Sequence, residues 1–547
     1  MTRPNILWFS IEDISPRFGC SGDRVARTPN IDRLASEGRR YTNAFSTAGV
    51  CAPSRCAIIT GMYQTSIGAH HMRTTHTNDD APEMPTPYQA VPPAYVKAFP
   101  EYLRAAGYYC TNNAKTDYQF APPFTAWDEC GSDGHWRNRE DGQPFFAVFN
   151  PTVTHESGMW PKDGERLTTD ANTVTLPPYI PDTHKAREAM ARHYDNLERA
   201  DDRLGEVLAQ LDEDGLAENT IVVLWSDHGE GLPRGKRWLY DAGIRIPLIV
   251  RWPGAVPAGD VSARLVSLVD LGPTMLSLAG LEPPRHMQGQ PFLGPNATDR
   301  EYAFAARDRH DEAYDMVRAV RDTRYKYIRN YHSELPYLLW IPYRNRHPAL
   351  QEMWRLNTED ALDPPLDVMF QTPRPPEELY DTHADHYELD NLAGRADHED
   401  RLARMRAALR SWQDEHGDLG HEPEAEMAAR MWPDGEQPVT ARPTFVPICE
   451  SSPGMAASPE GATLVGPALV QLHCATQGAS IGYTTEDGGE PRWSLYTEPL
   501  RLPAGATTIR AKATRIGYAE SETREASFVA VPNGSAAPTP TDEADSA

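Results

Sequence analysis

The sequence predicts an α/β protein built on a doubly wound sheet, followed by a smaller α+β subdomain and a C-terminal β-sandwich. Between residues 5 and 251, short apolar runs of strand length alternate with amphipathic helical patterns. After about residue 300 the pattern changes to alternating antiparallel strands. Residues 440–532 are rich in Val, Thr and Gly and contain no helical periodicity.

The first region supplies the strands of the large sheet. Residues 5–11 (NILWFSI) form a buried apolar run that ends in two acidic residues. A helix is predicted from Thr28-Pro29 to Gly38, because Pro suits the first helical turn and Gly suits a helix end. A long helix is predicted over residues 185–213 from its apolar spacing. Further strands are predicted at residues 107–112, 145–149, 220–226 and 246–251.

Three more segments follow this α/β region, which is predicted to span residues 1–300. Residues 301–436 contain alternating strands at 316–331 and one closing helix with an apolar face of Leu402, Met405, Leu409 and Trp412. The prolines 438, 443 and 447 mark a boundary before the β-sandwich at 440–532. The last segment, 533–547, is an acidic tail whose composition predicts disorder.

The charge balance excludes several classes of partner. The 547 residues include 53 Lys and Arg against 78 Asp and Glu, for a net charge of −25. Such a charge repels nucleic acid and anionic membranes, so we expect neither as a partner. No apolar run approaches the roughly 18 residues of a membrane span, and the N-terminus lacks a signal-peptide pattern. We therefore expect a cytoplasmic protein as numbered, or a periplasmic or secreted one if a leader was removed. Seven cysteines spread over the chain do not form a disulfide framework.

The most specific motif is GVCAPSRCAIITGMY at residues 49–63. It places Cys51 just before a Pro-started helix, where backbone amides favour an anion, and Arg55 offers a fork for a tetrahedral oxyanion. The string resembles the sulfatase signature C-x-P-S-R followed by a T-G pair. In that family the Cys is oxidised to formylglycine, whose hydrated aldehyde attacks sulfur. The resemblance therefore implies that Cys51 is the nucleophile, that a formylglycine-generating enzyme acts during maturation, and that the large sheet has the alkaline-phosphatase-like fold.

The resemblance also implies a divalent metal site. Glu12 and Asp13 end the first strand where sulfatases carry two Asp ligands, so Glu12 is a departure by one methylene. Asp227 and His228 match the second ligand pair, and Cys51 contributes its modified side chain. Many sulfatases have Asn at the position of His228, whereas some phosphonate-cleaving relatives have His. An oxygen-rich site favours Ca²⁺, and the imidazole leaves Mg²⁺ or Mn²⁺ open.

Three further residues match cations around the sulfate in the family. Lys115 resembles the Lys of the family's G-K-W-H segment, although Asp117 stands where that segment has its His. Lys236 matches the second active-site Lys. His155 follows the strand at 145–149 and matches the His that contacts the leaving group.

The remaining motifs bear on the substrate. Residues 374–393, together with 316–331, are most similar to the sulfamidase (heparan N-sulfatase) branch and its bacterial relatives, and the resemblance covers about residues 4–395. Candidate substrate contacts follow the signature helix and the start of the second subdomain: His70, His71, Arg73, Arg307, Arg309 and His310. Each of them has an alternative interpretation as an ordinary polar loop residue.

The β-sandwich resembles the chitobiase/hexosaminidase C-terminal domain. Trp493 and Tyr496 are candidates for stacking on a sugar, and core packing or a subunit contact is the alternative for both. The sequence leaves homo-oligomerisation open.

These residues predict a sulfatase that cleaves an O- or N-sulfated saccharide, such as a glycosaminoglycan. Two alternatives remain at this point. His228 supports a phosphonate or phosphate ester hydrolase of the same superfamily. Glu12 and Asp117 support a non-catalytic sulfated-glycan-binding protein in which Cys51 stays a thiol.

Overall fold

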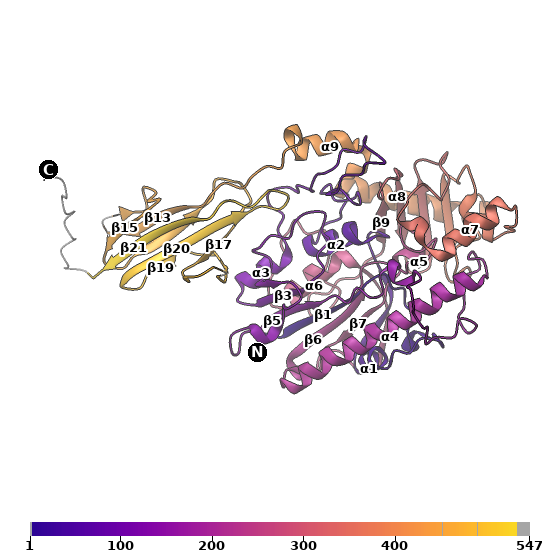
Figure 1. The fold of residues 1–547 in the computed structure, drawn as a ribbon, viewed down its shortest axis with the longest axis horizontal. Helices are drawn as coiled ribbons and strands as arrows, with labels where there is room; N and C mark the ends of the chain where they lie inside the picture. Colours follow the sequence, from indigo (N-terminus) through magenta and orange to yellow (C-terminus); the bar gives the residue numbers. More distant parts are fainter. Residues whose placement is uncertain (1–2, 451, 490, 533–547) are drawn as a thin grey trace.

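The computed structural model describes residues 3–450, 452–489 and 491–532. Its largest element is an eight-stranded mixed sheet in the order β4-β3-β5-β1-β6-β7-β2-β8 (Figure 1). Only β7 runs antiparallel to its neighbours β6 and β2. This sheet confirms the predicted α/β class. The strands are β1 (Asn5–Ile11), β2 (Arg39–Phe45), β3 (Tyr109–Asn113), β4 (Glu129–Cys130), β5 (Phe145–Phe149), β6 (Thr220–Ser226), β7 (Leu248–Arg251) and β8 (Asp260–Ser267).

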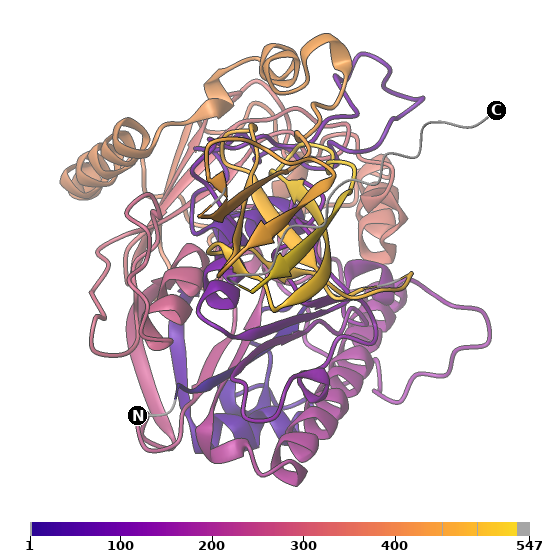
Figure 2. The same ribbon diagram turned by 90° about the vertical axis from the view of Figure 1, so that its left-hand side faces the viewer.

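Helices cover both faces of this sheet (Figures 1 and 2). One face packs against α1 (Pro29–Glu37) and the long α4 (His184–Glu213). The other packs against α2 (Cys51–Thr60), α3 (Phe99–Ala105) and α6 (Leu271–Leu278). Leucines at helical spacing on α4 bury one side of the helix, and each contributes roughly 1.5–3 kcal/mol. In the described part of the chain, no helix has the length and apolarity needed to cross a membrane.

Strand ends differ from the sequence prediction at two places. The strand predicted at 246–251 begins only at Leu248, because Pro247 has no N–H to donate to a neighbouring strand. The strand predicted at 107–112 begins at Tyr109, after the turn at Gly107, whose φ is 90°. Neither shift moves the carboxyl end of β1 or β6, where the candidate site lies.

The second subdomain contains a four-stranded antiparallel sheet in the order β12-β11-β10-β9. Its helix α8 (Glu399–His416) buries Leu402, Met405, Leu409 and Trp412, as predicted. A further helix, α9 (Glu424–Met431), was not predicted and links this region to the sandwich. The other elements are β9 (Ala303–Arg307), β10 (Val317–Arg321), β11 (Tyr325–Asn330), α7 (Pro348–Thr358) and β12 (Glu377–Asp381).

The C-terminal region forms two β-sheets that share an apolar core and stand at one end of the molecule (Figure 1). The predicted tail, 533–547, lies outside the described residues. One sheet contains β13 (Thr444–Cys449), β14 (Ser452–Pro453), β16 (Leu469–His473) and β19 (Leu500–Arg501). The other contains β15 (Gly461–Val465), β17 (Ser480–Thr484), β18 (Ser494–Leu495), β20 (Gly505–Thr514) and β21 (Arg524–Val531).

The sandwich packs directly on the catalytic region. Arg104 donates a hydrogen bond to the Trp493 carbonyl at 2.7 Å, and the Trp493 ring lies 5.9 Å from that of Phe124. The Lys512 ammonium stands 4.0 Å from the centre of the same Phe124 ring. Tyr496 accepts a hydrogen bond from the Leu472 amide within the sandwich. Both aromatic residues therefore have structural partners, which favours packing over sugar stacking.

Deleting residues 440–547 should leave kcat/KM for a small aryl sulfate within about threefold, a change of under roughly 1 kcal/mol in transition-state energy. The reason is that, among the described residues, no residue of the sandwich contacts the cluster around Cys51 that is described below. Steady-state kinetics of the truncated and full chains test this. A Phe124→Ser version of the truncation controls for aggregation at the uncovered ring. A folded truncation with much slower aryl sulfate turnover would contradict the prediction.

Candidate active site

The candidate site forms where two neighbouring parallel strands end. β1 and β6 pair in register from Asn5 and Thr220 onward, so the residues after Ile11 and Ser226 lie side by side. The Asp13 amide donates a hydrogen bond to Asp227 Oδ1 at 3.2 Å. Asp13 adopts a left-handed φ of 53°, a strained conformation typical of functional sites. Strand pairing thus brings both predicted ligand pairs together.

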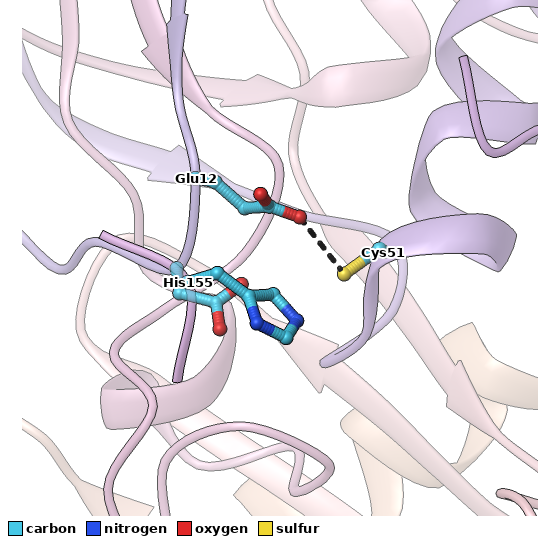
Figure 3. A group of neighbouring side chains, drawn as sticks. Glu12, Cys51 and His155 are labelled. Atoms are coloured by element: carbon cyan, nitrogen blue, oxygen red, sulfur yellow. Dashed lines mark hydrogen bonds between the residues drawn. The ribbon is translucent and has the colours of Figure 1, made fainter. Parts of the chain in front are cut away.

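Cys51 is the first residue of α2 and faces these strand ends. Its thiol donates toward Glu12 Oε1 at 3.6 Å and lies 3.3 Å from His228 Nε2. Figure 3 shows Glu12 and His155 converging on the thiol from the strand side. Burial raises the pKa of Cys51 well above its ordinary value. The unmodified side chain therefore stays a protonated thiol, which is a poor nucleophile.

The donor atoms around Cys51 fit a divalent cation. One ligand atom from each of Asp13, Cys51, Asp227 and His228 lies within 4.8 Å of the others, and Glu12 and His155 form a second such group with Asp13 and Cys51. His228 Nδ1 lies 2.9 Å from the Gly229 carbonyl, and this contact orients the ring so that Nε2 faces the cluster. Asp13 Oδ1 is buried 3.1 Å from His228 Nε2 and has no hydrogen bond of good geometry. Carboxylate oxygens and a ring nitrogen that gather in one buried place match the donor set of a metal site.

Positive groups keep the buried carboxylates ionised. Burial alone would raise the pKa of Asp13, but Lys236 and His228 outweigh it and hold that pKa well below its usual range. Burial alone would also raise the pKa of Asp227. The charges of His228 and Arg55 outweigh burial and lower that pKa. Both side chains therefore carry the negative charge that a cation requires.

Arg55 is positioned differently from the sequence prediction. Its Nε donates to Asp227 Oδ2 at 3.0 Å, and its Nη atoms donate to Asn150 and Ser10 at 3.1 and 3.3 Å. The predicted fork for a sulfate oxyanion is thus occupied by protein acceptors. In this arrangement Arg55 orients Asp227.

The other predicted cations surround the same cluster. Lys236 donates to Asp13 at 2.7 Å and lies 3.1 Å from His155 Nε2. Lys115 pairs with Glu12 and stands 3.7 Å from Asp117, the residue at the position of the family's His. Burial, followed by the Lys236 charge, lowers the pKa of His155 to about 4. His155 is therefore neutral near pH 7, and its Nε2 accepts a hydrogen bond from the Lys236 ammonium.

Sequence reasoning missed a buried ion pair that supports these residues. Arg237 donates to both Glu156 oxygens at 2.7 and 2.8 Å, and the Glu156 amide donates to Asp13 at 2.8 Å. Lys236 also lies 3.3 Å from Glu156. The sequence offered one indication of this pair, since Glu156 directly follows His155 and Arg237 directly follows Lys236.

A second group of buried cations lies around Trp238. The guanidinium groups of Arg307 and Arg344 stand 5.5 and 5.4 Å from its ring centre. Both arginines have buried nitrogens without a hydrogen-bond partner, as do both ring nitrogens of His310. Burial, then the charges of Arg237 and Arg307, lowers the pKa of Arg344 to about 9. Arg344 carried no recognisable sequence signal. The surplus of unpaired donors favours an anionic ligand, and the substrate role of Arg307 and His310 stays a prediction.

The remaining predicted substrate residues have partners away from Cys51. The His70 and His71 rings are buried 4.2 Å apart, and His71 Nδ1 accepts from the Arg309 amide. The Arg309 side chain forms a two-bond pair with Glu424. Arg73 is partly exposed and lies 3.6 Å from Asp311. No described contact joins these four residues to the thiol, so their predicted role is untested.

Buried histidines predict how stability depends on pH. Burial lowers the pKa of His193 and His347 to about 4, whereas an unfolded histidine titrates near 6.5. Between these values the unfolded chain binds more protons, so the free energy of unfolding should fall as pH falls from about 6.5 toward 4. Each such histidine contributes up to about 1.4 kcal/mol per pH unit. Calorimetry from pH 7.5 to 5 should show this decline, and His193→Asn should flatten it. A pH-independent Tm would contradict the prediction.

Comparison with known proteins agrees with this geometry. The Sulfatase family profile matches residues 4–129 and 135–281. The profile for the C-terminal region of N-sulphoglucosamine sulphohydrolase matches 229–341, and that of the chitobiase/beta-hexosaminidase C-terminal domain matches 459–525.

Among curated proteins, an ulvan-active sulfatase of Formosa agariphila is 41% identical over 95% of this chain and 90% of its own length. Human N-sulphoglucosamine sulphohydrolase is 26% identical over 75% of this chain and 90% of its own. Among solved structures, a complex with D-glucosamine-2-N,6-O-disulfate is 19% identical with a TM-score of 0.54, covering 77% of this chain and 99% of that one. A phosphonate monoester hydrolase of Agrobacterium radiobacter is 19% identical with a TM-score of 0.53, covering 77% of this chain and 97% of that one. The fold, the matched profiles and the near-full-length relative together place this chain in the sulfatase family.

Proposed function

We propose that this protein is a formylglycine-dependent sulfatase that removes sulfate from ulvan or a chemically similar sulfated polysaccharide. The observation that carries the proposal is the 41% identity to an ulvan-active sulfatase over 95% of the chain. The convergence of Cys51 with two pairs of metal donors supports the same chemistry.

The modification of Cys51 is part of the proposal. A hydrated formylglycine would supply one hydroxyl to attack sulfur and a second to release the sulfate afterwards. The raised pKa of the Cys51 thiol supports this, because the unmodified side chain lacks the charge of a nucleophile.

The proposed metal is Ca²⁺, and its proposed ligands are Glu12, Asp13, Asp227 and His228. A divalent cation at this place would polarise the sulfate oxygens and offset the charge that develops on them. Within the chain, Lys115 and Lys236 add two positive charges beside the same carboxylates. These charges compensate the negative charge of the sulfate ester more strongly in a buried site than in water.

His155 and Lys236 are proposed to move the proton that the leaving oxygen needs. Their nitrogen atoms lie 3.1 Å apart, within hydrogen-bond distance. Because His155 is neutral and Lys236 is charged, the proton shared by the pair lies on Lys236 Nζ, which also donates a hydrogen bond to Asp13. A positioned acid of this kind contributes about 10²–10⁴ in rate.

Buried nitrogen atoms without hydrogen-bond partners around Trp238 support a polyanionic saccharide. Arg307, Arg344 and His310 each keep buried nitrogen atoms without a hydrogen-bond partner, and Arg307 lies 3.6 Å from Asp315. Such groups cost free energy unless a ligand satisfies them, so an anionic sugar residue next to the scissile sulfate fits this region.

A phosphonate ester hydrolase is the second candidate, and His228 is the residue that favours it. The likeness to the phosphonate monoester hydrolase is at the level of the fold, with a TM-score of 0.53. The sulfatase-named relative is far more similar in sequence, at 41% identity.

Rates on matched substrates test the proposal. Protein co-expressed with a formylglycine-generating enzyme is assayed on ulvan oligosaccharides, an aryl sulfate, an aryl phosphonate monoester and a phosphate diester. Sulfate release is followed by ion chromatography, and mass spectrometry of the Cys51 peptide reports the modification. We expect the highest kcat/KM on ulvan oligosaccharides. Faster phosphonate hydrolysis would favour the second candidate, and an unmodified Cys51 with no turnover would favour a glycan-binding protein.

A further inference from the structure

A cleft with a volume of 460 Å³ opens beside the outer part of the central sheet. Arg40 and Ile249, paired across β2 and β7, line it together with the segment from Ser15 to Asp23. The second subdomain contributes residues 386–388. None of the catalytic or metal-site residues proposed above lines this cleft, so it is a separate site.

Three arginines line the cleft without a carboxylate partner. In the described residues, the Arg40 side chain makes no hydrogen bond or ion pair, and Arg245 donates only to the Thr42 carbonyl at 3.1 Å. Arg234 is 1% exposed, yet its Nε and Nη1 have no hydrogen-bond partner. A buried guanidinium with unmet donors indicates a missing acceptor.

Three of the four acidic groups that line the cleft have a cationic partner, and the fourth is held by neutral donors. Glu230 forms a two-bond pair with Arg17. Asp241 pairs with Lys326 at 2.5 Å, and Glu388 lies 3.1 Å from the same lysine. The fourth acid, Asp23, accepts hydrogen bonds from the Tyr194 hydroxyl and from the amides of Val25 and Ala26. The unpaired charge of the cleft is therefore positive, although the whole chain carries −25.

Aromatic side chains stand beside these arginines. The Tyr179 and Tyr387 rings lie 6.2 Å apart at the cleft, and Tyr387 is 40% exposed. The Arg234 guanidinium stands 3.5 Å from the centre of the Tyr240 ring, which holds it in place. Exposed aromatic rings pack on the C–H faces of sugars, whereas guanidinium groups bind sulfate and carboxylate.

From these contacts we propose that the cleft is a second binding site for an anionic saccharide, where Arg40, Arg245 and Arg234 hold a sulfate or carboxylate group and Tyr387 contacts the sugar ring. The inference rests on the proposed function, because a polysaccharide substrate supplies such groups along one chain. A chain bound at both places would stay near the active centre between cleavage events, which raises its effective concentration.

Binding to inactive protein tests the site. In the Cys51→Ala background, calorimetry with ulvan oligosaccharides should detect two binding steps. Arg40→Ala should weaken one step at least about tenfold, or about 1.4 kcal/mol. Arg410→Ala, which removes an exposed arginine on α8 that makes no ion pair in the described residues, should leave both steps unchanged. Desulfated and carboxyl-reduced oligosaccharides identify whether the sulfate or the carboxylate is bound.

Kinetics of the modified enzyme provide a second readout. Arg40→Ala should raise KM for polymeric ulvan while leaving kcat for a small aryl sulfate within about twofold. Arg245→Gln serves as a second variant, and equal Tm values exclude a folding defect. Arg40→Ala and Arg245→Gln proteins that bind and turn over ulvan like Arg410→Ala would overturn the site. If the protein binds ulvan at the cleft but never releases sulfate, the proposed function alone is refuted.

Discussion

Cys51→Ala should reduce sulfate release by more than about 10⁴, to the background of the assay. The loss follows because no other described residue is placed to act as the nucleophile. The fold should persist, since Glu12 and His228 are the hydrogen-bond partners of the thiol among the described residues and the start of α2 needs no sulfur. Cys51→Ser should also fail to turn over repeatedly, because a sulfated serine has no second hydroxyl to expel the product. Phosphate-free sulfate release assays and calorimetric Tm values measure both effects.

Cys56→Ala is the matched control for this experiment. Cys56 lies on the same helix and is fully buried, but it faces the apolar core rather than the metal donors. Its loss should leave turnover within a few-fold of the parent. Multiple-turnover activity in Cys51→Ala or Cys51→Ser would remove the mechanism proposed here.

Asp227→Ala should lower kcat/KM by about 10²–10³, by analogy with the loss of one electrostatic stabiliser. The carboxylate is buried, and it links the metal donors to Arg55 through a bond of 3.0 Å. Its removal leaves the proposed cation short of one negative charge and leaves Arg55 without its partner. Elemental analysis of the purified variant should show less bound metal, a readout that does not depend on activity.

Chelation gives the same test on the formylglycine-containing enzyme without any substitution. EDTA should inactivate the enzyme, and re-addition of Ca²⁺, Mg²⁺ or Mn²⁺ in separate samples identifies the ion that restores it. Asp202→Ala, at an exposed position on α4, controls for the loss of one acidic charge. A fully active preparation without metal would refute the ligand roles of Asp13 and Asp227, and with them those of Glu12 and His228.

Much of the candidate site was predictable because its residues occupy strand and helix ends. An apolar run such as residues 5–11 predicts a buried strand, and residues at the carboxyl ends of neighbouring parallel strands must lie close together. The motif around Cys51 added the chemistry of that edge. For these positions, local periodicity and motif spacing carry the information, and the structure places them together.

Other features required the tertiary structure, because they depend on segments far apart in the sequence. Arg55 looked available for an anion, yet its donors are occupied by Asp227 and Asn150 from two other strand ends. The pairing of Trp493 with Phe124 likewise joins two separate domains. The cleft at Arg40 arises only where β2, the loop after β1 and residues 386–388 meet. Sequence patterns therefore determined the fold class and the sheet edge that carries the candidate active site. Long-range packing decided which charged side chains remain unpaired.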